Sequence, residues 1–126
     1  MLLNEYIEAL TKAIQKLDDY GLAEVIEFNS ELRGSKKAVL NIKVILINKS
    51  ALYIREYLNG KYGIERIDYA YQYQTEKGTL IFRYDNAKHK PALGFDEHKH
   101  TQNGSIISSQ LPPIDEIVDE VIMDLT

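Results

Sequence analysis

The sequence predicts an α+β fold in which an antiparallel meander sheet of about five strands packs against an N-terminal and a C-terminal helix. Three observations predict it. Apolar residues recur at three- and four-residue steps near both ends of the chain, and the period changes to two over residues 22–85. Only short turns separate the alternating segments, which leaves no room for crossover helices. A length of 126 residues suits one ordinary domain, and we expect a single domain over 1–126.

The first expected element is an amphipathic helix over residues 4–20. Asn4 is the predicted N-cap, because its side chain can accept a hydrogen bond from a free backbone N–H. Gly21 is the predicted end, since glycine takes a left-handed conformation without a Cβ clash. The apolar positions that follow the helical period are Leu3, Tyr6, Ile7, Leu10, Ile14 and Leu17.

Five strands are expected next, over residues 22–31, 37–47, 51–58, 64–75 and 79–85. The second is the clearest, because every second residue from Ala38 to Leu46 is apolar. Such alternation requires one face of the strand to be buried.

Tyrosines line one side of the fourth expected strand. Ile67, Tyr69, Tyr71 and Tyr73 alternate with Arg66, Asp68, Gln72 and Gln74. Rings at this spacing form a core or a dimer interface, with their hydroxyls at the rim. Alternatively, Tyr69 and Tyr71 stack the bases of single-stranded RNA on an exposed sheet.

Residues 86–112 are predicted to form a long loop that contains all three histidines. A second amphipathic helix is expected over residues 113–125, with Pro113 at its start and acidic residues on its outer face.

Composition restricts the class of protein. The chain has no Cys, which excludes disulfides, thiolate nucleophiles and Cys-based zinc sites and suits a reducing cytosol. No apolar run approaches the ~20 residues of a membrane span, and the N-terminus lacks the features of a signal peptide. We therefore expect a cytoplasmic protein that does not enter the membrane.

Charge is unevenly distributed within the net −4. Residues 33–61 contain seven basic residues against one acidic residue, Glu56, whereas both ends of the chain are acidic. The basic strands either meet phosphate or an acidic partner, or pair with the acidic helices of the same chain.

The three histidines, His89, His98 and His100, lie within twelve residues of one another. One chemical interpretation is acid–base catalysis on a phosphodiester, in which His89 works with His98 or His100. One neutral imidazole would take the 2′-hydroxyl proton while a protonated one supplies the leaving oxygen. Positive side chains would stabilise the phosphoryl charge or bind nucleic acid: Arg83, Lys88, Lys90 and Lys99.

Two other interpretations of this segment stay open. His98 and His100 with Asp85 or Asp96 could ligate a divalent transition metal, although the spacing matches no standard zinc signature. Alternatively, the histidines are solvated groups on a polar loop. The chain contains no Gly-rich nucleotide fingerprint and no usable serine triad, so we expect no cofactor.

The block Phe82-Arg83-Tyr84-Asp85-Asn86-Ala87, followed by His89 and then His98-Lys99-His100, resembles the TumE-like toxin family of prokaryotic toxin–antitoxin modules. The resemblance runs over about residues 5–122 and is most specific in residues 82–100. It implies a small cytoplasmic toxin whose partner is an antitoxin, often a helix-turn-helix DNA-binding protein. By motif position it assigns the site to Arg83, Asp85, Asn86, His89, His98 and His100.

The sequence thus leads to one main hypothesis and two alternatives. The main one is a toxin that acts on RNA, as a ribonuclease using histidine acid–base chemistry. The first alternative is a non-catalytic module that binds nucleic acid or protein through the tyrosine face and the basic strands. The second is an interaction domain, for instance a homodimer, whose histidine loop orders against a partner.

Overall fold

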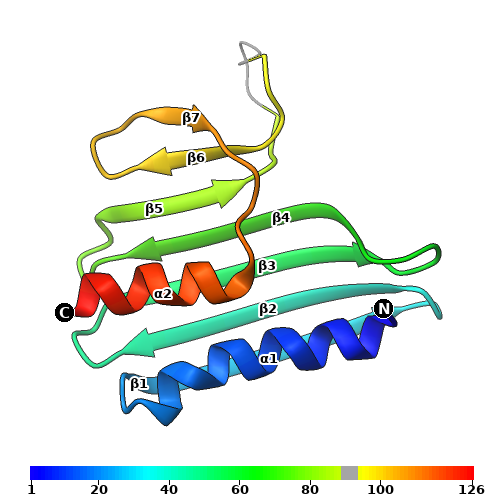
Figure 1. Ribbon diagram of the computed structural model, residues 1–126, viewed down its shortest axis with the longest axis horizontal. Helices are drawn as coiled ribbons and strands as arrows, with labels where there is room; N and C mark the ends of the chain where they lie inside the picture. Colours follow the sequence, from blue (N-terminus) through cyan, green and yellow to red (C-terminus); the bar gives the residue numbers. More distant parts are fainter. Residues whose placement is uncertain (89–93) are drawn as a thin grey trace.

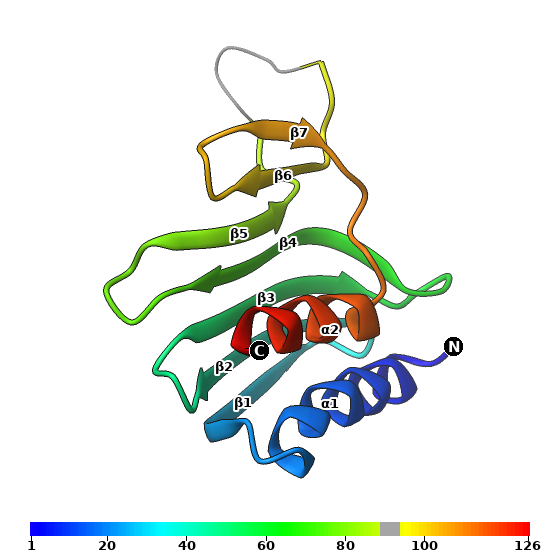
Figure 2. The same ribbon diagram turned by 60° about the vertical axis from the view of Figure 1, so that its left-hand side comes forward.

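The computed structural model describes residues 1–88 and 94–126, which form a seven-stranded sheet with two helices on one of its faces (Figures 1 and 2). The strands lie in chain order and every neighbouring pair is antiparallel. They are β1 (Ala23–Arg33), β2 (Lys37–Leu46), β3 (Ala51–Asn59), β4 (Glu65–Gln74), β5 (Leu80–Asp85), β6 (His98–Thr101) and β7 (Ile106–Ser108). The predicted α+β meander is confirmed, with seven strands instead of about five.

Helices α1 (Leu3–Asp19) and α2 (Ile114–Leu125) lie side by side on the same face of the sheet (Figure 2). Both are held there by apolar stripes, because burying such a stripe removes its surface from water. The buried positions are Leu10, Ala13, Ile14 and Leu17 in α1 and Ile117, Val118 and Val121 in α2.

The start of α1 differs from the prediction, whereas its end agrees. Leu2, not Asn4, is the N-cap, and its backbone N–H donates to Glu5 Oε1 at 3.0 Å. The helix begins earlier because Leu3 packs against the core and extends the apolar stripe. Gly21 has a φ of 70° and follows the last turn, as predicted.

The tyrosine side of β4 faces the helices and forms part of the core. Tyr69 and Tyr71 are only 3% and 1% exposed, and Tyr73 is buried beside Phe82. The prediction that Tyr69 and Tyr71 stack RNA bases is therefore wrong, because the helices cover their face of the sheet. The core interpretation is the correct one.

Arg66 also lies differently from its expected place on the polar side of β4. Its Nε donates to Glu56 Oε2 at 3.0 Å and to the Tyr6 hydroxyl at 3.1 Å, so it reaches α1. The cause is a register shift between Tyr57 and Leu58 in the β3–β4 pairing, which breaks the alternation at the start of β4.

Residues 86–112, predicted as a loop, include the hairpin of β6 and β7. Thr101 N–H donates to Ser105 O at 2.9 Å, and Gly104 N–H donates to Thr101 O at 3.0 Å. Gly104 has a φ of 88°, which suits the tight turn. The prediction missed β6 because its four residues, His98–Thr101, contain no apolar alternation.

One face of the sheet packs against α1 and α2, and we call the face that points away from them the open face.

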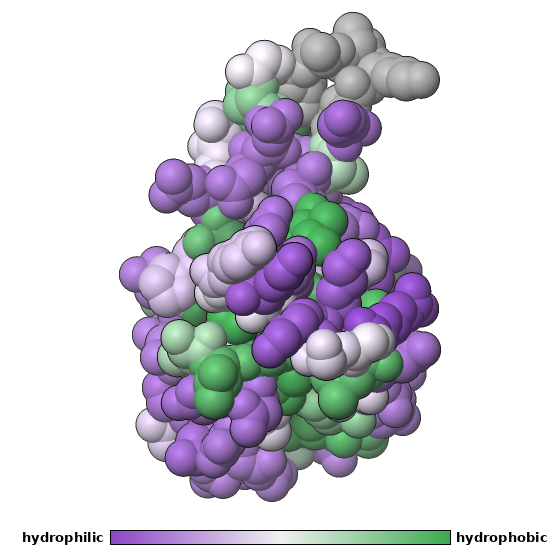
Figure 3. All heavy atoms as spheres, turned by 90° about the vertical axis from the view of Figure 1, so that its right-hand side faces the viewer, coloured by the Kyte–Doolittle hydropathy of each residue, from purple (hydrophilic) through white to green (hydrophobic). Residues whose placement is uncertain are grey.

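At the end of the molecule where α1 begins, Figure 3 shows green hydrophobic patches among purple hydrophilic side chains. Leu2, Leu3, Ile7 and Leu32 line a hollow of about 480 Å³ at this end. Among the described residues, no helix combines the length and apolar content that crossing a membrane requires.

Candidate functional site

Strand pairing brings the predicted site residues together. In the β5–β6 register, Asp85 lies opposite His98 and Arg83 lies opposite His100. Because side chains alternate along a strand, these four residues share one face and Lys99 points to the other. The shared face is the open face, since Phe82 and Tyr84, which alternate with Arg83 and Asp85 along β5, are buried in the core.

Asp85 is the centre of this cluster. Its Oδ1 lies 2.6 Å from His98 Nε2, and its Oδ2 lies 2.7 Å from Arg83 Nε and 3.5 Å from His100 Nε2. The backbone N–H of Ala87 donates to Oδ1 at 3.1 Å. Burial alone would raise the pKa of Asp85. The hydrogen bonds from Arg83 and Ala87 and the charges of His98 and Arg83 outweigh burial and lower that pKa.

His98 is fully buried and fixed at both nitrogens. Its Nδ1 lies 3.1 Å from the carbonyl oxygen of Asp96, and its Nε2 contacts the Asp85 carboxylate. The Asp85 carboxylate accepts a hydrogen bond from the Nε2 side of the ring. This buried contact holds Asp85 in place.

His100 and Arg83 are the members of the cluster that reach solvent. Their side chains are 23% and 33% exposed, against none for His98. Arg83 Nη1 donates to Gln72 Oε1 at 2.7 Å, which fixes the guanidinium beside Asp85. Arg83 is permanently positive and lies beside the imidazole of His100 at the surface. The two side chains can bind an anion and exchange a proton with it.

The same residues are the candidate metal site. One ligand atom each from Asp85, His98 and His100 lies within 4.8 Å of the others. Two imidazoles and a carboxylate suit a transition metal. However, two ligand atoms on one tetrahedral zinc lie roughly 3.3 Å apart for the usual ~2.0 Å bonds. The 2.6 Å contact between His98 and Asp85 would have to open, and His98 would have to lose a proton.

Other predicted site residues lie away from this cluster. The Asn86 side chain accepts from Tyr69 N–H at 3.0 Å and donates to Ile67 O at 3.2 Å, so it binds the backbone of β4. Lys99 lies on the helix side, where its Nζ contacts Glu120 Oε2 at 3.0 Å and covers the Tyr84 ring. Strand alternation thus turns Lys99 towards α2 and away from the Asp85 cluster, and its predicted role in binding nucleic acid stays a prediction.

The remaining predicted residues are Lys88, His89 and Lys90. Lys88 is exposed, three residues beyond Asp85. His89 and Lys90 lie outside the described residues, so their predicted roles stay predictions.

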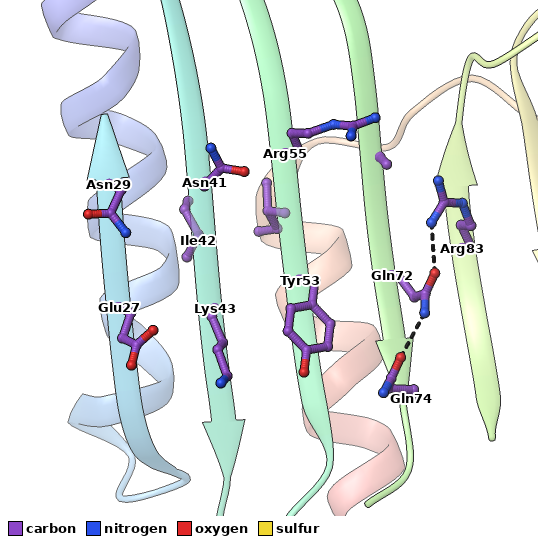
Figure 4. A pocket seen from close by; sticks show the side chains of 12 residues that line it. Glu27, Asn29, Asn41, Ile42, Lys43, Tyr53, Arg55, Gln72, Gln74 and Arg83 are labelled. Atoms are coloured by element: carbon purple, nitrogen blue, oxygen red, sulfur yellow. Dashed lines mark hydrogen bonds between the residues drawn. The ribbon is translucent and has the colours of Figure 1, made fainter. Parts of the chain in front are cut away.

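A polar groove of about 560 Å³ on the open face ends at Arg83. Figure 4 shows side chains from β1 to β5 lining it, among them Lys43 and Tyr53. Sequence reasoning did not identify Lys43, Tyr53 or Gln72 as site residues. Pairing register was the missing signal, since it links residues that lie far apart in the chain.

The fold and the cluster define a class: a small α+β protein with an arginine, an aspartate and two histidines clustered on an uncovered sheet face. A family model described as Toxin TumE matches residues 11–126. The chain belongs to the TumE toxin family, which confirms the resemblance seen in residues 82–100. It is thus a toxin component of a toxin–antitoxin module, with an antitoxin as its partner. None of the curated proteins and none of the solved structures matches it.

Proposed function

We propose that this toxin acts in the cytoplasm on RNA, cleaving the phosphodiester by histidine acid–base chemistry at the Asp85 cluster. The observation that carries the proposal is the shared carboxylate oxygen: Asp85 Oδ2 faces both Arg83 Nε and His100 Nε2. A phosphate binder and a proton carrier are thereby held side by side at the surface.

In this proposal His100 makes one of the two proton transfers. A base removes the 2′-hydroxyl proton, O2′ attacks phosphorus, and the bond from phosphorus to O5′ breaks. An acid then gives a proton to O5′, and the products are a cyclic phosphate and a free 5′-hydroxyl. His89 is the predicted second group.

Arg83 and Asp85 support that reaction in different ways. Arg83 stabilises the negative charge that develops on the phosphoryl oxygens, because its guanidinium still has N–H donors beyond those given to Asp85 and Gln72. Asp85 orients His100 and stabilises its protonated form. His98 is a positioning residue, since it is fully buried and acts through Asp85.

The test is inducible expression in a bacterial host, with growth and RNA integrity as readouts. We expect His100→Ala to lower the cleavage rate by roughly 10²–10⁴-fold, the usual contribution of a proton-transfer group. Gln102→Ala, at an exposed turn residue nearby, is the matched control and should leave growth arrest unchanged. Arrest that persists in His100→Ala and Arg83→Ala would contradict the site. Arrest with intact cellular RNA would contradict the choice of RNA.

The finer identity of the antitoxin is a proposal as well. We propose a helix-turn-helix DNA-binding protein, as the family resemblance implies. The gene beside the toxin gene tests it: a short helix-turn-helix reading frame supports the proposal, and an adjacent antitoxin of another fold contradicts it.

A further inference from the structure

The open face carries a row of side chains that leads into the Asp85 cluster. Lys43 pairs with Tyr53, Tyr53 with Gln72, Gln72 with Arg83, and Arg83 with His100. These five residues come from five consecutive strands and lie in one line across the sheet. At about 4.8 Å between strands, the row spans about 19 Å.

Each end of the row has a different chemistry. At the Arg83 end lies the proposed reaction centre. At the other end Lys43 is half-buried on β2 and forms no hydrogen bond or ion pair with any residue of 1–88 or 94–126. An ammonium group that none of these residues pairs is suited to binding an anion from outside.

Tyr53 lies between these two cations. It is 38% exposed, although the tyrosines on the other face of the sheet are buried. Figure 4 shows its ring on β3 between Lys43 and the side chains of β4. An exposed ring flanked by cations on a sheet is the arrangement that stacks unpaired bases, since every base has a π-face.

The second row across the sheet deepens the groove. Arg55 on β3 pairs with Ala70 on β4, and Ala70 pairs with Asp85 on β5. Ala70 lines the groove with a single methyl group, so it leaves space between longer side chains. Arg55 adds positive charge, with only a loose exposed contact of 3.7 Å to Asp68.

We infer that the row from Lys43 to His100 is a binding track for single-stranded RNA, with Lys43 on a phosphate and Tyr53 stacked on a base. This inference rests on the proposed function and names its substrate class. Duplex RNA fits poorly, because its bases are paired and stacked on one another and cannot lie on Tyr53. Glu27, opposite Lys43 on β1, ends the track with a negative charge.

Binding is measured by fluorescence anisotropy with labelled oligouridine whose 2′-hydroxyls are methylated. Such a probe cannot be cleaved by attack of its own 2′-oxygen, so the protein is used with all residues of the proposed reaction centre intact. We expect Tyr53→Ala to weaken binding roughly tenfold, as loss of one stacked base does, without changing the salt dependence. Lys43→Gln should lower the slope of log affinity against log salt by about 0.7, because one phosphate contact is lost.

Two matched controls lie outside the groove. Tyr62 is 92% exposed on the β3–β4 connection, and Lys77 lies exposed in the β4–β5 turn. Tyr62→Ala and Lys77→Gln should both bind like wild type. Glu27→Gln should bind about threefold more tightly at low salt and equally at high salt, since a screened repulsion is removed. A gain of affinity cannot come from misfolding.

Three results would overturn the inference. If wild type binds the probe and the Tyr53 and Lys43 variants bind equally well, RNA lies elsewhere and the proposed function stands. If an RNA duplex binds more tightly than the single strand, the substrate class is wrong. If wild type binds no RNA of either kind, the inference and the RNA part of the proposed function fail together.

Discussion

Two buried carboxylates lie on opposite faces of the same sheet and have different kinds of partner. Glu56 on β3 faces the helices and accepts hydrogen bonds from the Tyr6 and Tyr71 hydroxyls and from Arg66. Asp85 on β5 faces away from the helices and is held by Arg83 and two histidines. Phenols donate without titrating near neutral pH, whereas an imidazole gains and loses a proton there.

This difference separates a buried charge that serves the fold from one that would serve the proposed chemistry. The Glu56 partners join α1, β3 and β4, so that cluster fastens a helix to the sheet. The Asp85 partners come from two adjacent strands, and two of them reach solvent. Substitutions in each cluster should therefore separate stability from activity.

The largest effect on stability is expected for Glu56→Ala. Removing the carboxylate leaves two buried hydroxyls and Arg66 without their acceptor, at a cost of about 3–5 kcal/mol in the free energy of unfolding. Urea denaturation measures this cost. Glu56→Gln keeps one acceptor oxygen and should cost less, and folded Glu56 variants should cleave RNA at the wild-type rate. Lost cleavage in a folded variant would show that the two clusters share a function.

Asp85→Asn should have the opposite effect, a small loss of stability and a large loss of activity. The amide keeps the size of the side chain but removes the ionised acceptor of His98, which lowers the free energy of unfolding by about 1–3 kcal/mol. Growth arrest should nevertheless be abolished, because His100 and Arg83 lose the group that orients them. Urea denaturation and growth curves on the same variant give both values. Full arrest by Asp85→Asn would make Asp85 a second structural carboxylate like Glu56.

Tyr6→Phe tests the weaker part of the Glu56 cluster. It removes the hydroxyl that donates to Glu56 and accepts from Arg66, and about 1–2 kcal/mol of stability should be lost. The matched control is Tyr20→Phe, whose ring is exposed at the end of α1. Equal urea midpoints for the two variants would argue against a role for Tyr6 in fastening the helix.

The two faces should also respond to opposite extremes of pH. The pKa of Asp85 is lowered in the folded state, so its stabilising contribution is present above about pH 4 and is lost as pH falls further. On the helix face, burial first and then the Asp124 hydrogen bond and charge raise the pKa of Tyr73 to about 12. Its contribution is complete below about pH 10 and is lost as pH rises towards 12.

Thermal unfolding across pH checks both directions. Asp85→Asn should reduce the drop in melting temperature below pH 4 and leave the drop at alkaline pH unchanged. Tyr73→Phe should reduce only the drop at alkaline pH. If either substitution changed the acid and alkaline drops equally, the two faces would not titrate independently.

The smallest effect is expected from metal ions. Zinc or manganese must open the short His98–Asp85 contact and displace a proton from His98, so we expect no rise in melting temperature at neutral pH. His98→Gln, which removes one of the three ligands, is the control. A rise in melting temperature that this substitution abolishes would favour the metal interpretation of the cluster.

Much of the fold could be predicted from the sequence, because apolar periodicity records which side of each element is buried. Both helices and β1 to β5 follow from it within two residues at each end. The hairpin of β6 and β7 could not be predicted in this way, since a strand of His, Lys, His and Thr pairs through its backbone and its histidines. Its Asn103-Gly104 turn was the only local signal.

The site was predicted as a group but not as an arrangement. Nearness in sequence grouped Asp85, His98 and His100 correctly. It could not distinguish the fully buried His98 from the partly exposed His100, because that difference depends on how the folded chain packs around each ring; Phe95, for example, lies 6.4 Å from His98 between ring centroids. It also could not connect Lys43 or Tyr53 to this group, since their proximity comes from strand pairing across four strands.

Because side chains alternate along β6, the pairing register decides which of them face Asp85. A pairing of β6 with β5 that was shifted by one residue would turn every side chain of β6 to the opposite face. His98 and His100 would then face α2, and Lys99 would take their place beside Asp85. Every residue of the cluster would still be present in the sequence, yet the carboxylate would meet a lysine instead of two imidazoles. The pairing register of β6 is therefore as necessary to the proposed chemistry as the histidines themselves.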